Sequence, residues 1–537
     1  MYYNPNYNPY KSQRSVVYGK NGCVATSQAL AAQAGLHILR SGGNAIDAAI
    51  ATAAALTVCE PCSNGIGSDA FALIWSKGKL HGLNSSGAAP ASISADAIKK
   101  LGHDKMPPYG WLPVTVPGAP GAWAALHSKF GRLAFDEVLT PAIQYAREGY
   151  PLSPRVANAW SRAFTNYTKH NTGGELNEWF NTFAPHGRAP EVGEIWSSKN
   201  HADTLDEIAK TKSESFYRGS LAKKIAAASK AAGGFLTEDD LAAFNPLWVE
   251  PISVNYRGYD IWEIPPNGQG LVALSALNIL RGFDFTTRDE QETIHKQIEA
   301  IKMGFTAGKQ VITDPLHTNQ KHVEWLLGDD FAAKARKQIG SEALMPTPFD
   351  LPKGGTVYLC TADGEGNMVS FIQSNYMGFG SGIVVPGTGI SMQNRGHDFS
   401  LDSGHVNCLE GGKRTYHTII PGFLTKDNCP IGPFGVMGGY MQPQGHVQVI
   451  MNTLDFGLNP QMALDAPRWR WDKDKTVFVE GSFPEHIAKA LAARGHDIQV
   501  TLDASGFGNG QIIWRDEKTG VLAGGTESRT DGAVVAF

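Results

Sequence analysis

A threonine preceded by two glycines opens a predicted strand late in the chain. Gly354, Gly355 and Thr356 stand directly before the run that begins at Val357. By composition alone, Gly-Gly-Thr at the start of a strand is an ordinary loop exit. If the chain is cut between Gly355 and Thr356, however, Thr356 carries a nucleophilic hydroxyl together with a base, its own α-amino group. The pKa of an α-amino group, about 7.7 to 8.0, lies near neutral pH, where a general base works best.

Composition and charge exclude other classes of partner. Lys+Arg 47 and Asp+Glu 51 give the 537 residues a net charge of -4, with no long run of one sign. Nucleic-acid and anionic-membrane surfaces need clustered cations, so neither partner is expected. The most apolar stretch, residues 45–58, contains Asp47 and is too short for a membrane span. Because residues 1–20 lack the apolar region of a secretory signal and six cysteines do not make a disulfide scaffold, a cytoplasmic location is expected.

Two features with metal-ligand residue types have simpler explanations. Cys59 and Cys62 have redox or half-zinc-site spacing, but no second Cys or His pair completes a site, and a buried helix end explains them. The sixteen histidines are scattered, which makes a metal hydrolase the weakest alternative. The sequence therefore predicts neither a metal nor an organic cofactor.

The predicted elements place Thr356 between a mainly helical part and a β-rich part. Residues 45–56 are apolar nearly all round, which indicates a helix buried on several faces. Residues 123–339 show mostly helical patterns, with a strand at 259–263. No linker marks a domain boundary, so strands from both halves have to share one core. The later strands are expected at 356–361, 368–374, 406–409 and 419–424, with a turn at 363–367 and a helix at 443–456.

Blocks along nearly the whole chain resemble the gamma-glutamyltranspeptidase family of N-terminal-nucleophile hydrolases. The resemblance implies an α+β fold, a four-layer αββα sandwich formed jointly by both halves of the chain. It also implies a proenzyme that cuts itself before a catalytic Thr, which the spacing to the turn at 363–367 places at Thr356. The products would be a large chain, 1–355, and a small chain, 356–537, held together as a heterodimer in one intertwined domain, possibly paired into a dimer of heterodimers. The matching blocks are residues 39–49, 65–69, 116–118, 363–367, 379–383, 398–400, 438–439 and 466–468.

The resemblance assigns further catalytic roles. Ser374 falls where the family has a Thr whose hydroxyl supports the nucleophile, although a strand hydroxyl is equally compatible with a structural role. Gly438 and Gly439 match a glycine pair whose backbone N–H groups bind the developing oxyanion. Only glycine lets the main chain approach that closely, but a plain turn is the other interpretation.

The substrate pocket combines matches with departures. Asp398 falls where the family holds the substrate's α-amino group, and Thr418 in a pair of hydroxyl positions lining the same pocket. His417 takes the other position of that pair, where Ser is usual. Ser86 stands where true transpeptidases have an Arg that grips the γ-glutamyl carboxylate, and a serine cannot supply that bidentate cation.

Two further departures bring a new cation to the pocket. Tyr376 replaces an Asn, and Arg395 lies in a Gln-Asn-Arg-Gly segment that replaces an Asn-Gln pair, close to Asp398. An added Arg beside the nucleophile suits a small carboxylate whose amide lies closer to the acid than in glutathione. These substitutions resemble the transpeptidase-like amidohydrolase branch, which includes oxamate amidohydrolase.

The sequence thus predicts a self-cleaving amidohydrolase that acts on a small amide, such as the short amide acid oxamate, through an acyl-enzyme on Thr356. One alternative is a gamma-glutamyl hydrolase or transpeptidase acting on glutathione-like donors, with Arg395 replacing the missing Arg. A second is a family member that stays unprocessed and serves as a binding protein, because a Thr inside the chain has no free amine to act as base.

Overall fold

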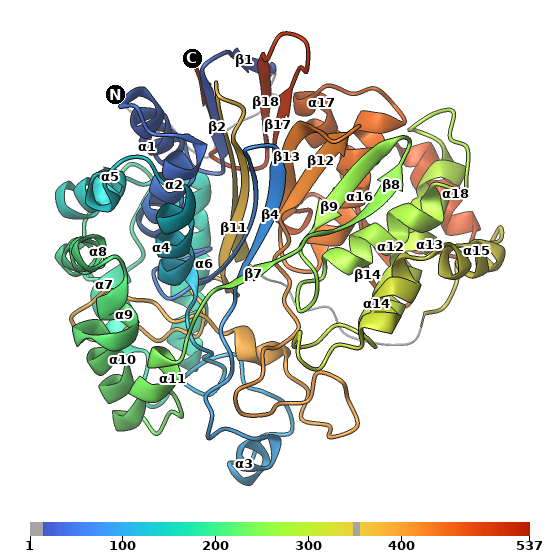
Figure 1. The fold of residues 1–537 in the computed structure, drawn as a ribbon. Coiled ribbons are helices and arrows are strands. Elements are labelled where there is room, and N and C mark those ends of the chain that lie inside the picture. Colours follow the sequence, from blue (N-terminus) through green and yellow to red (C-terminus); the bar gives the residue numbers. More distant parts are fainter. Residues whose placement is uncertain (1–13, 347–354) are drawn as a thin grey trace.

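Two seven-stranded antiparallel sheets lie at the centre of the molecule (Figure 1), for which a computed structural model describes residues 14–346 and 355–537. Gly354, next to the predicted cut, falls outside the described residues. In both sheets, strands that precede residue 355 pair with strands that follow it. The first, the β13 sheet, has the order β1 (Val17–Gly19), β18 (Leu522–Thr526), β17 (Asn509–Arg515), β13 (Cys429–Met437), β12 (Gly422–Lys426), β9 (Tyr259–Glu263) and β8 (Ile252–Tyr256). The second, the β10 sheet, has the order β19 (Ala533–Ala536), β2 (Gly22–Thr26), β10 (Gly355–Asp363), β11 (Met368–Tyr376), β3 (Asp69–Ser76), β4 (Lys79–Ser85) and β7 (Leu247–Val249).

The two sheets pack face to face, and β10 shows how its sequence permits this. Successive side chains of a strand point to opposite faces. Tyr358 and Cys360 of β10 belong to the apolar cluster between the sheets, together with Phe423 of β12. Val357 and Leu359 belong instead to the cluster shared with the helices outside the sheet. The strand is therefore buried on both faces, as its nearly continuous apolar sequence requires.

One group of helices covers the outer face of the β10 sheet (Figure 1). All residues of α2 (Ala45–Cys59) are buried, which confirms the prediction of a helix buried on several faces. It begins with a capping box between Asn44 and Asp47. Cys59 ends this helix, and both it and Cys62 are buried free thiols, in agreement with the structural explanation of their spacing. The neighbouring helices are α1 (Ala29–Arg40), α4 (Ala119–Phe130), α5 (Phe135–Glu148), α6 (Pro154–His170), α7 (Asn177–Phe183), α8 (Lys199–Thr211), α9 (Glu214–Arg218), α10 (Ser220–Ala231) and α11 (Glu238–Ala242). The short helix α3 (Ala95–Lys100) lies apart from them, at the bottom of Figure 1.

A second group of helices packs on the outer face of the β13 sheet. Its central member is α16 (Met441–Leu454), which follows β13 after a short turn and runs beside α12 (Gly270–Leu280). The remaining elements of this half are α13 (Gln291–Gly308), α14 (Gln320–Leu327), α15 (Asp329–Gln338), α17 (Pro460–Asp465), α18 (Glu485–Ala493) and a small sheet of β14 (Trp469–Lys473), β15 (Thr476–Glu480) and β16 (Asp497–Thr501). A two-stranded sheet of β5 (Tyr150–Pro151) and β6 (Ile195–Trp196) lies elsewhere.

The mixed helix-and-sheet class is confirmed, and so is the strand at 259–263. The strand expected at 406–409 is wrong, since only an isolated bridge between Ser400 and Cys408 forms there. Local side chains take its backbone groups instead: Lys413 Nζ donates to the Val406 carbonyl and His405 Nδ1 accepts from Asn407 N–H. Within the described residues, no helix combines the length and the apolar character that a membrane crossing requires.

Candidate active site

Thr356 lies at an irregularity in the first ladder of β10. Gly355 pairs with Tyr376 and Val357 with Gln373, and the register shifts between these pairs. Such a bulge leaves the extra residue outside the ladder and redirects its side chain. Thr356 itself is fully buried, yet it lines a cavity.

A short chain of hydrogen bonds joins Thr356 to the carbonyl that precedes it. Thr356 Oγ1 lies 3.0 Å from Ser374 Oγ. Ser374 Oγ in turn donates to the Gly355 carbonyl at 2.8 Å and accepts from the Tyr376 N–H at 2.8 Å. Since Ser374 donates to the carbonyl, Thr356 is the donor in the contact between the two hydroxyls. The arrangement polarises the Gly355 carbonyl and leaves an acceptor for the Thr356 proton.

The predicted oxyanion glycines occupy the turn between β13 and α16. Gly438 has φ 137 and Gly439 has φ 60, conformations that favour glycine. Gly438 lines the same cavity as Thr356. The turn stands at the N-terminus of a 14-residue helix, where N–H groups and the helix dipole favour negative charge. Backbone N–H groups in this position could bind an oxyanion, which a turn without a following helix would not favour in the same way.

The cavity that contains Thr356 has a volume of about 590 Å³. Helix α6, strand β14 and residues between 501 and 509 contribute to its lining. Aromatic rings of Tyr109, Tyr440 and Trp471 contribute to its lining. Pockets of 300 to 1,000 Å³ accommodate ligands of drug size, so the cavity has room for more than a very small amide.

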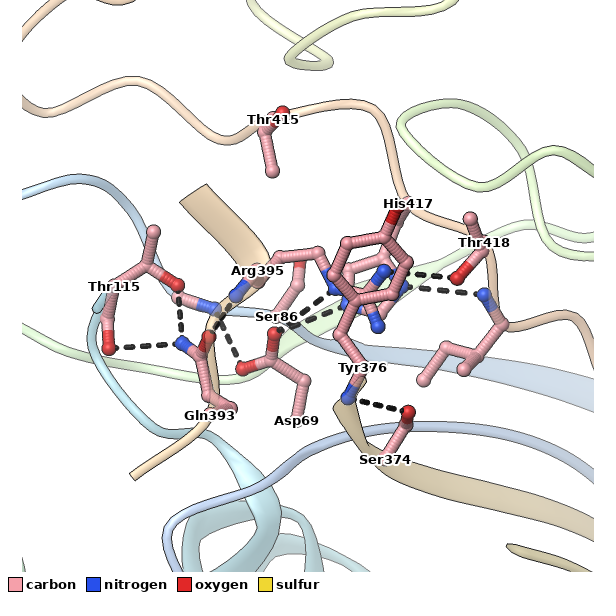
Figure 2. A network of polar contacts seen from close by, with 12 residues as sticks. Asp69, Ser86, Thr115, Ser374, Tyr376, Gln393, Arg395, Thr415, His417 and Thr418 are labelled. Carbon is pink, nitrogen blue, oxygen red and sulfur yellow. Dashed lines mark hydrogen bonds and ion pairs between the residues drawn. The ribbon is translucent and has the colours of Figure 1, made fainter. Parts of the chain in front are cut away.

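Arg395 is the centre of a buried polar network that adjoins this cavity (Figure 2). Its Nη1 donates to Thr418 Oγ1 at 2.8 Å and lies 3.7 Å from Asp398 Oδ2. The guanidinium stacks on the Tyr376 ring with 4.1 Å between its carbon and the ring centroid. Within the described part of the chain, Arg395 Nε and Nη2 have no hydrogen-bond acceptor, and Asp398 Oδ2 has no donor. The structure thus brings four of the predicted pocket residues together, but none of them lines the cavity directly.

His417 enters the network through Asp69, a residue to which sequence reasoning gave no role. His417 Nε2 lies 3.0 Å from Asp69 Oδ2, and its Nδ1 accepts from the Ile419 N–H. The ring is therefore a neutral tautomer that donates to Asp69. Burial, followed by the Arg395 charge, lowers the pKa of His417 well below its usual value. Burial also raises the pKa of Asp69 to about 7, against the opposing influence of Arg395.

Asp398 connects the network to the cavity wall. Its Oδ1 accepts from the Tyr376 hydroxyl at 2.8 Å and from the Tyr440 hydroxyl at 3.2 Å. Tyr440 lines the cavity, and the buried Lys309 ammonium binds its hydroxyl. Burial lowers the pKa of Lys309 to about 8, against the charge of Asp398. Lys309 directly follows α13 and was not identified from the sequence.

Ser86 stands where the resemblance implies an arginine, and a different arginine lies beside it. Ser86 is buried and donates to Asn84 Oδ1 at 2.7 Å. Arg414 Nε donates to the Ser86 carbonyl at 3.0 Å, and the Arg414 charge acts on Asp69. A cation therefore stands beside Ser86, although it comes from a residue 328 positions away. The two residues are too far apart in the sequence for a local pattern to reveal this contact.

One group of possible metal ligands lies outside the cavity. His295, Glu299 and His496 are buried with their ligand atoms within 4.8 Å of one another, the one such group among residues 14–346 and 355–537. His295 Nδ1 lies 2.9 Å from His496 Nε2, while Lys302 Nζ donates to Glu299 at 2.8 Å. His496 Nδ1 has no hydrogen-bond partner among the described residues. None of the three side chains lines the cavity that holds Thr356.

Thr356 thus lies at the start of a central strand of two packed sheets, and it shares its cavity with a glycine turn that precedes a helix. The sequence matches the family described as gamma-glutamyltranspeptidase over residues 31–537. The chain therefore belongs to this family and is an enzyme of it.

Three similar proteins span nearly the full chain. The glutathione hydrolase-like YwrD proenzyme of Bacillus subtilis is 37% identical, covering 97% of this chain and 99% of that protein. The oxamate amidohydrolase proenzyme of Klebsiella pneumoniae is 32% identical, with 96% and 98% covered. Among solved structures, cephalosporin acylase from Bacillus halodurans is 63% identical with a TM-score of 0.97, covering 100% of this chain and 99% of that one. All three chains are thus of similar length and bear names of hydrolytic enzymes.

Proposed function

We propose that the protein is a self-cleaving amidohydrolase that acts through an acyl-enzyme on Thr356. The observation that carries the proposal is the chain of hydrogen bonds from Thr356 Oγ1 through Ser374 Oγ to the Gly355 carbonyl. This chain supplies a proton acceptor for the hydroxyl and a donor to the carbonyl under attack. The names of the two relatives as proenzymes support processing.

Processing begins with attack of Thr356 Oγ1 on the carbonyl carbon of Gly355. The hydroxyl proton moves to Ser374, whose own proton passes to the carbonyl oxygen. Collapse of the tetrahedral intermediate breaks the Gly355–Thr356 C–N bond and leaves an ester on Thr356, and the amine takes up the proton. Water then hydrolyses the ester, which gives a chain of residues 1–355 and a chain of residues 356–537 with a free amine.

Turnover uses the same hydroxyl with the new amine as base. The Thr356 amine accepts the hydroxyl proton while Oγ1 attacks the substrate amide, and later donates it to the leaving nitrogen. The N–H groups of Gly438 and Gly439 stabilise the oxyanion. Water releases the acyl group from Thr356 and regenerates the enzyme. This sequence of steps requires no metal or organic cofactor.

A carboxylate-bearing amide is the substrate class that the buried network supports. The unpaired N–H groups of Arg395 are donors suited to a carboxylate, and the unpaired oxygen of Asp398 suits an ammonium or amide donor. A short acyl group, as in oxamate, places its carboxylate close to the scissile carbonyl. Because neither Arg395 nor Tyr376 lines the cavity, this contact requires the side chains between Arg395 and the cavity to move.

A gamma-glutamyl hydrolase is the second candidate. Its specific support is Arg414, whose guanidinium binds the Ser86 carbonyl at the position of the family's carboxylate-binding Arg. Asp398 is then available for the α-amino group of the glutamyl substrate. The two candidates differ in which arginine holds the carboxylate, so their substrates separate them.

The test combines processing with a substrate comparison. The purified protein should give two bands, and the smaller should begin Thr-Val-Tyr-Leu. Thr356→Ala should abolish cutting and turnover, whereas Thr356→Ser should keep part of both because a hydroxyl remains. Faster turnover of oxamate and related short amide acids than of γ-glutamyl 4-nitroanilide supports the first candidate, and the reverse supports the second. An uncut chain with full amidase activity would refute the mechanism, and an uncut inactive chain would favour a binding protein.

A further inference from the structure

The turn of Gly438 and Gly439 has its carbonyl groups bound and its N–H groups free. The Gly438 carbonyl accepts from the Met441 N–H at 3.1 Å, and the Gly439 carbonyl accepts from the Gln442 N–H at 3.2 Å. Among the described residues, no acceptor binds the N–H of either glycine. Backbone N–H groups away from water normally have a partner, so this turn has two donors available to an oxyanion.

A further donor reaches the turn from the large chain of the predicted cut. Gln269, which directly precedes α12, donates from Nε2 to the Gly439 carbonyl at 3.0 Å. The same nitrogen donates to the Thr418 carbonyl at 2.5 Å. Gln269 is fully buried and is not part of the cavity lining. It therefore acts on the turn from behind, away from the space that a substrate would occupy.

The neighbours of Gln269 determine how its amide is oriented. The Tyr416 hydroxyl donates to Gln269 Oε1 at 3.0 Å, so Nε2 is the atom that faces the two carbonyls. Burial raises the pKa of Tyr416 well above its usual value, so this hydroxyl keeps its proton. The Gln269 backbone is held as well, because its N–H donates to the His417 carbonyl at 3.0 Å. A side chain fixed in this way can keep the carbonyl that it binds in one position.

Gln269 also joins the turn to the pocket around Arg395. Thr418, whose carbonyl binds Gln269, accepts from Arg395 Nη1 at 2.8 Å through its hydroxyl. A second contact runs parallel to the first, since the Ile420 N–H donates to Gln442 Oε1 at 2.9 Å. Two glutamines, one from each predicted chain, thus connect the segment that contains Thr418 to the turn. An acyl group held near Arg395 has to place its carbonyl oxygen at the turn, so this spacing affects the reacting geometry.

We propose that Gln269 is a positioning residue that keeps the N–H groups of Gly438 and Gly439 directed at the oxyanion. The proposal rests on the proposed function and adds a residue of the large chain to the oxyanion site of the small chain. Loss of the amide releases the Gly439 carbonyl, and rotation of that peptide moves the turn relative to Thr356. Because misplacement by about 1 Å can cost about 100-fold in rate, the loss falls on the reacting step.

Acetylation of Thr356 by 4-nitrophenyl acetate tests this role with a probe that favours neither candidate substrate. In the processed protein, Thr356 Oγ1 attacks the ester carbonyl, the acetyl group stays on Oγ1, and 4-nitrophenol leaves with the hydroxyl proton. Mass spectrometry of the small chain measures the rate. Gln269→Leu should lower this rate about 10- to 100-fold. It should leave cutting after Gly355 intact, since the proposed cut uses Ser374 as the donor to the carbonyl.

Gln461→Leu is the matched control for the loss of a buried amide. Gln461 is also buried, and its Nε2 donates to a backbone carbonyl, that of Thr526, at 2.8 Å. It lies on α17 and is not part of the cavity lining. This variant should lose stability as Gln269→Leu does, but it should keep the parental rate of acetylation.

Gln269→Glu separates positioning from packing, because the two side chains have nearly the same shape. A neutral glutamic acid can donate to one of the two carbonyls, whereas its carboxylate repels both. The acetylation rate of Gln269→Glu relative to the parent should therefore rise as the pH falls from 8 to 5. A ratio that does not change with pH would contradict the proposal, and this test remains decisive if Gln269→Leu fails to fold or to cut.

Hydrogen exchange reports on the turn without any reaction. The N–H groups of Met441 and Gln442, which bind the carbonyls of the turn, should exchange faster in Gln269→Leu than in the parent or in Gln461→Leu. Faster exchange in a protein whose parent does not acetylate Thr356 would support the positioning of the turn, while the proposed amidase mechanism would fail alone. Unchanged exchange, or equal acetylation rates in Gln269→Leu and Gln461→Leu, would overturn the proposal.

Discussion

At the residue scale, the site combines a nucleophile with an unusual density of buried charge. The side chains of Arg395, Asp69 and Asp398 are almost completely buried. Arg395 Nε lies 3.9 Å from Asp69 Oδ2, and Arg395 Nη1 lies 3.7 Å from Asp398 Oδ2. Burial of ions costs several kcal/mol each unless they are paired and hydrogen-bonded. Arg395 Nε and Nη2 have no hydrogen-bond acceptor among the described residues. These N–H groups are therefore available to bind an anionic group of a ligand. A substrate carboxylate is the group that the proposed function supplies.

The raised pKa of Asp69 leads to a prediction for stability against pH. Burial raises this pKa from about 3.8 to about 7, so between these values the folded protein holds a proton that the unfolded chain releases. Stability therefore falls as pH rises through this window, by about 1.4 kcal/mol for each pKa unit. Asp69→Asn should make this fall shallower, since the amide cannot ionise.

Chemical denaturation at pH 5, 6, 7 and 8 measures that effect on the processed protein. Glu60, whose pKa burial also raises to about 7, should preserve part of the fall in the variant. Asp136→Asn, which removes an exposed carboxylate from α5, controls for the loss of one negative charge. A slope in Asp69→Asn equal to that of the parent would show that Asp69 is ionised in the fold throughout the range.

Sequence reasoning at this scale expected Ser374 beside Thr356, which the structure confirms, while the role of Ser374 in catalysis stays a prediction. Ser374 was expected to support Thr356, and the two hydroxyls lie 3.0 Å apart on adjacent strands. The contacts of Arg414 with Ser86 and of His417 with Asp69 span 328 and 348 positions and were not foreseen. Such pairs depend on how distant loops meet across the sheets, which residue types and spacing do not encode.

At the element scale, α16 places its N-terminus directly after the turn of Gly438 and Gly439. Gly438 and the first helical residue, Met441, both line the cavity, so the N-terminus of the helix lies at the cavity. Gly438 needs φ 137, and a Cβ there would lie 3.0 Å from the Gly508 Cα. A side chain at this position would therefore shift the turn as well as strain it.

Gly438→Ala should consequently lower kcat about 100-fold or more, the usual loss when one oxyanion donor is displaced. Its processing can be followed by gel, so an effect on turnover is separable from an effect on cutting. Gly457→Ala is the matched control near the other end of α16: its φ of 65 is strained for alanine, but nothing lies within 4 Å of the added Cβ. That variant should lose about 1 kcal/mol of stability and keep the parental kcat. Equal kcat in the two variants would remove Gly438 from the mechanism.

Elements with strong local signals were the predictable ones. The apolar run at 45–56 became α2 because Asn44 caps it and helices and strands surround it on all sides. The turn at 363–367 joins β10 to β11 as expected. The expected strand at 406–409 failed because an apolar run alone does not provide a partner strand, and nearby polar side chains bind its backbone. The predicted cut stays a prediction, because Gly354 lies outside the described residues.

At the scale of the whole molecule, strands from before the proposed cut pair with strands from after it in both sheets. In the β10 sheet, β10 pairs with β2 and β11 pairs with β3, so strands from after the cut lie between strands from before it. In the β13 sheet, β12 pairs with β9 and β18 with β1. Separation of the fragments would break these ladders and expose the apolar cluster between the sheets.

The fragments of 355 and 182 residues (537 less 355) should therefore remain one particle after cutting. Native size exclusion should give a single peak containing both chains, and only denaturant should part them, because the exposed apolar area makes separation costly. Unfolding followed by tryptophan fluorescence should show one transition for both chains, since neither has a core of its own. Two native peaks, or a small fragment that unfolds by itself at lower denaturant, would mean that each half folds independently. The proposed nucleophile and oxyanion turn lie on the small chain, whereas α6, which also lines the cavity, lies on the large chain. Separation of the fragments should therefore abolish turnover. Mixing of the separated chains should restore turnover only if the sheets form again.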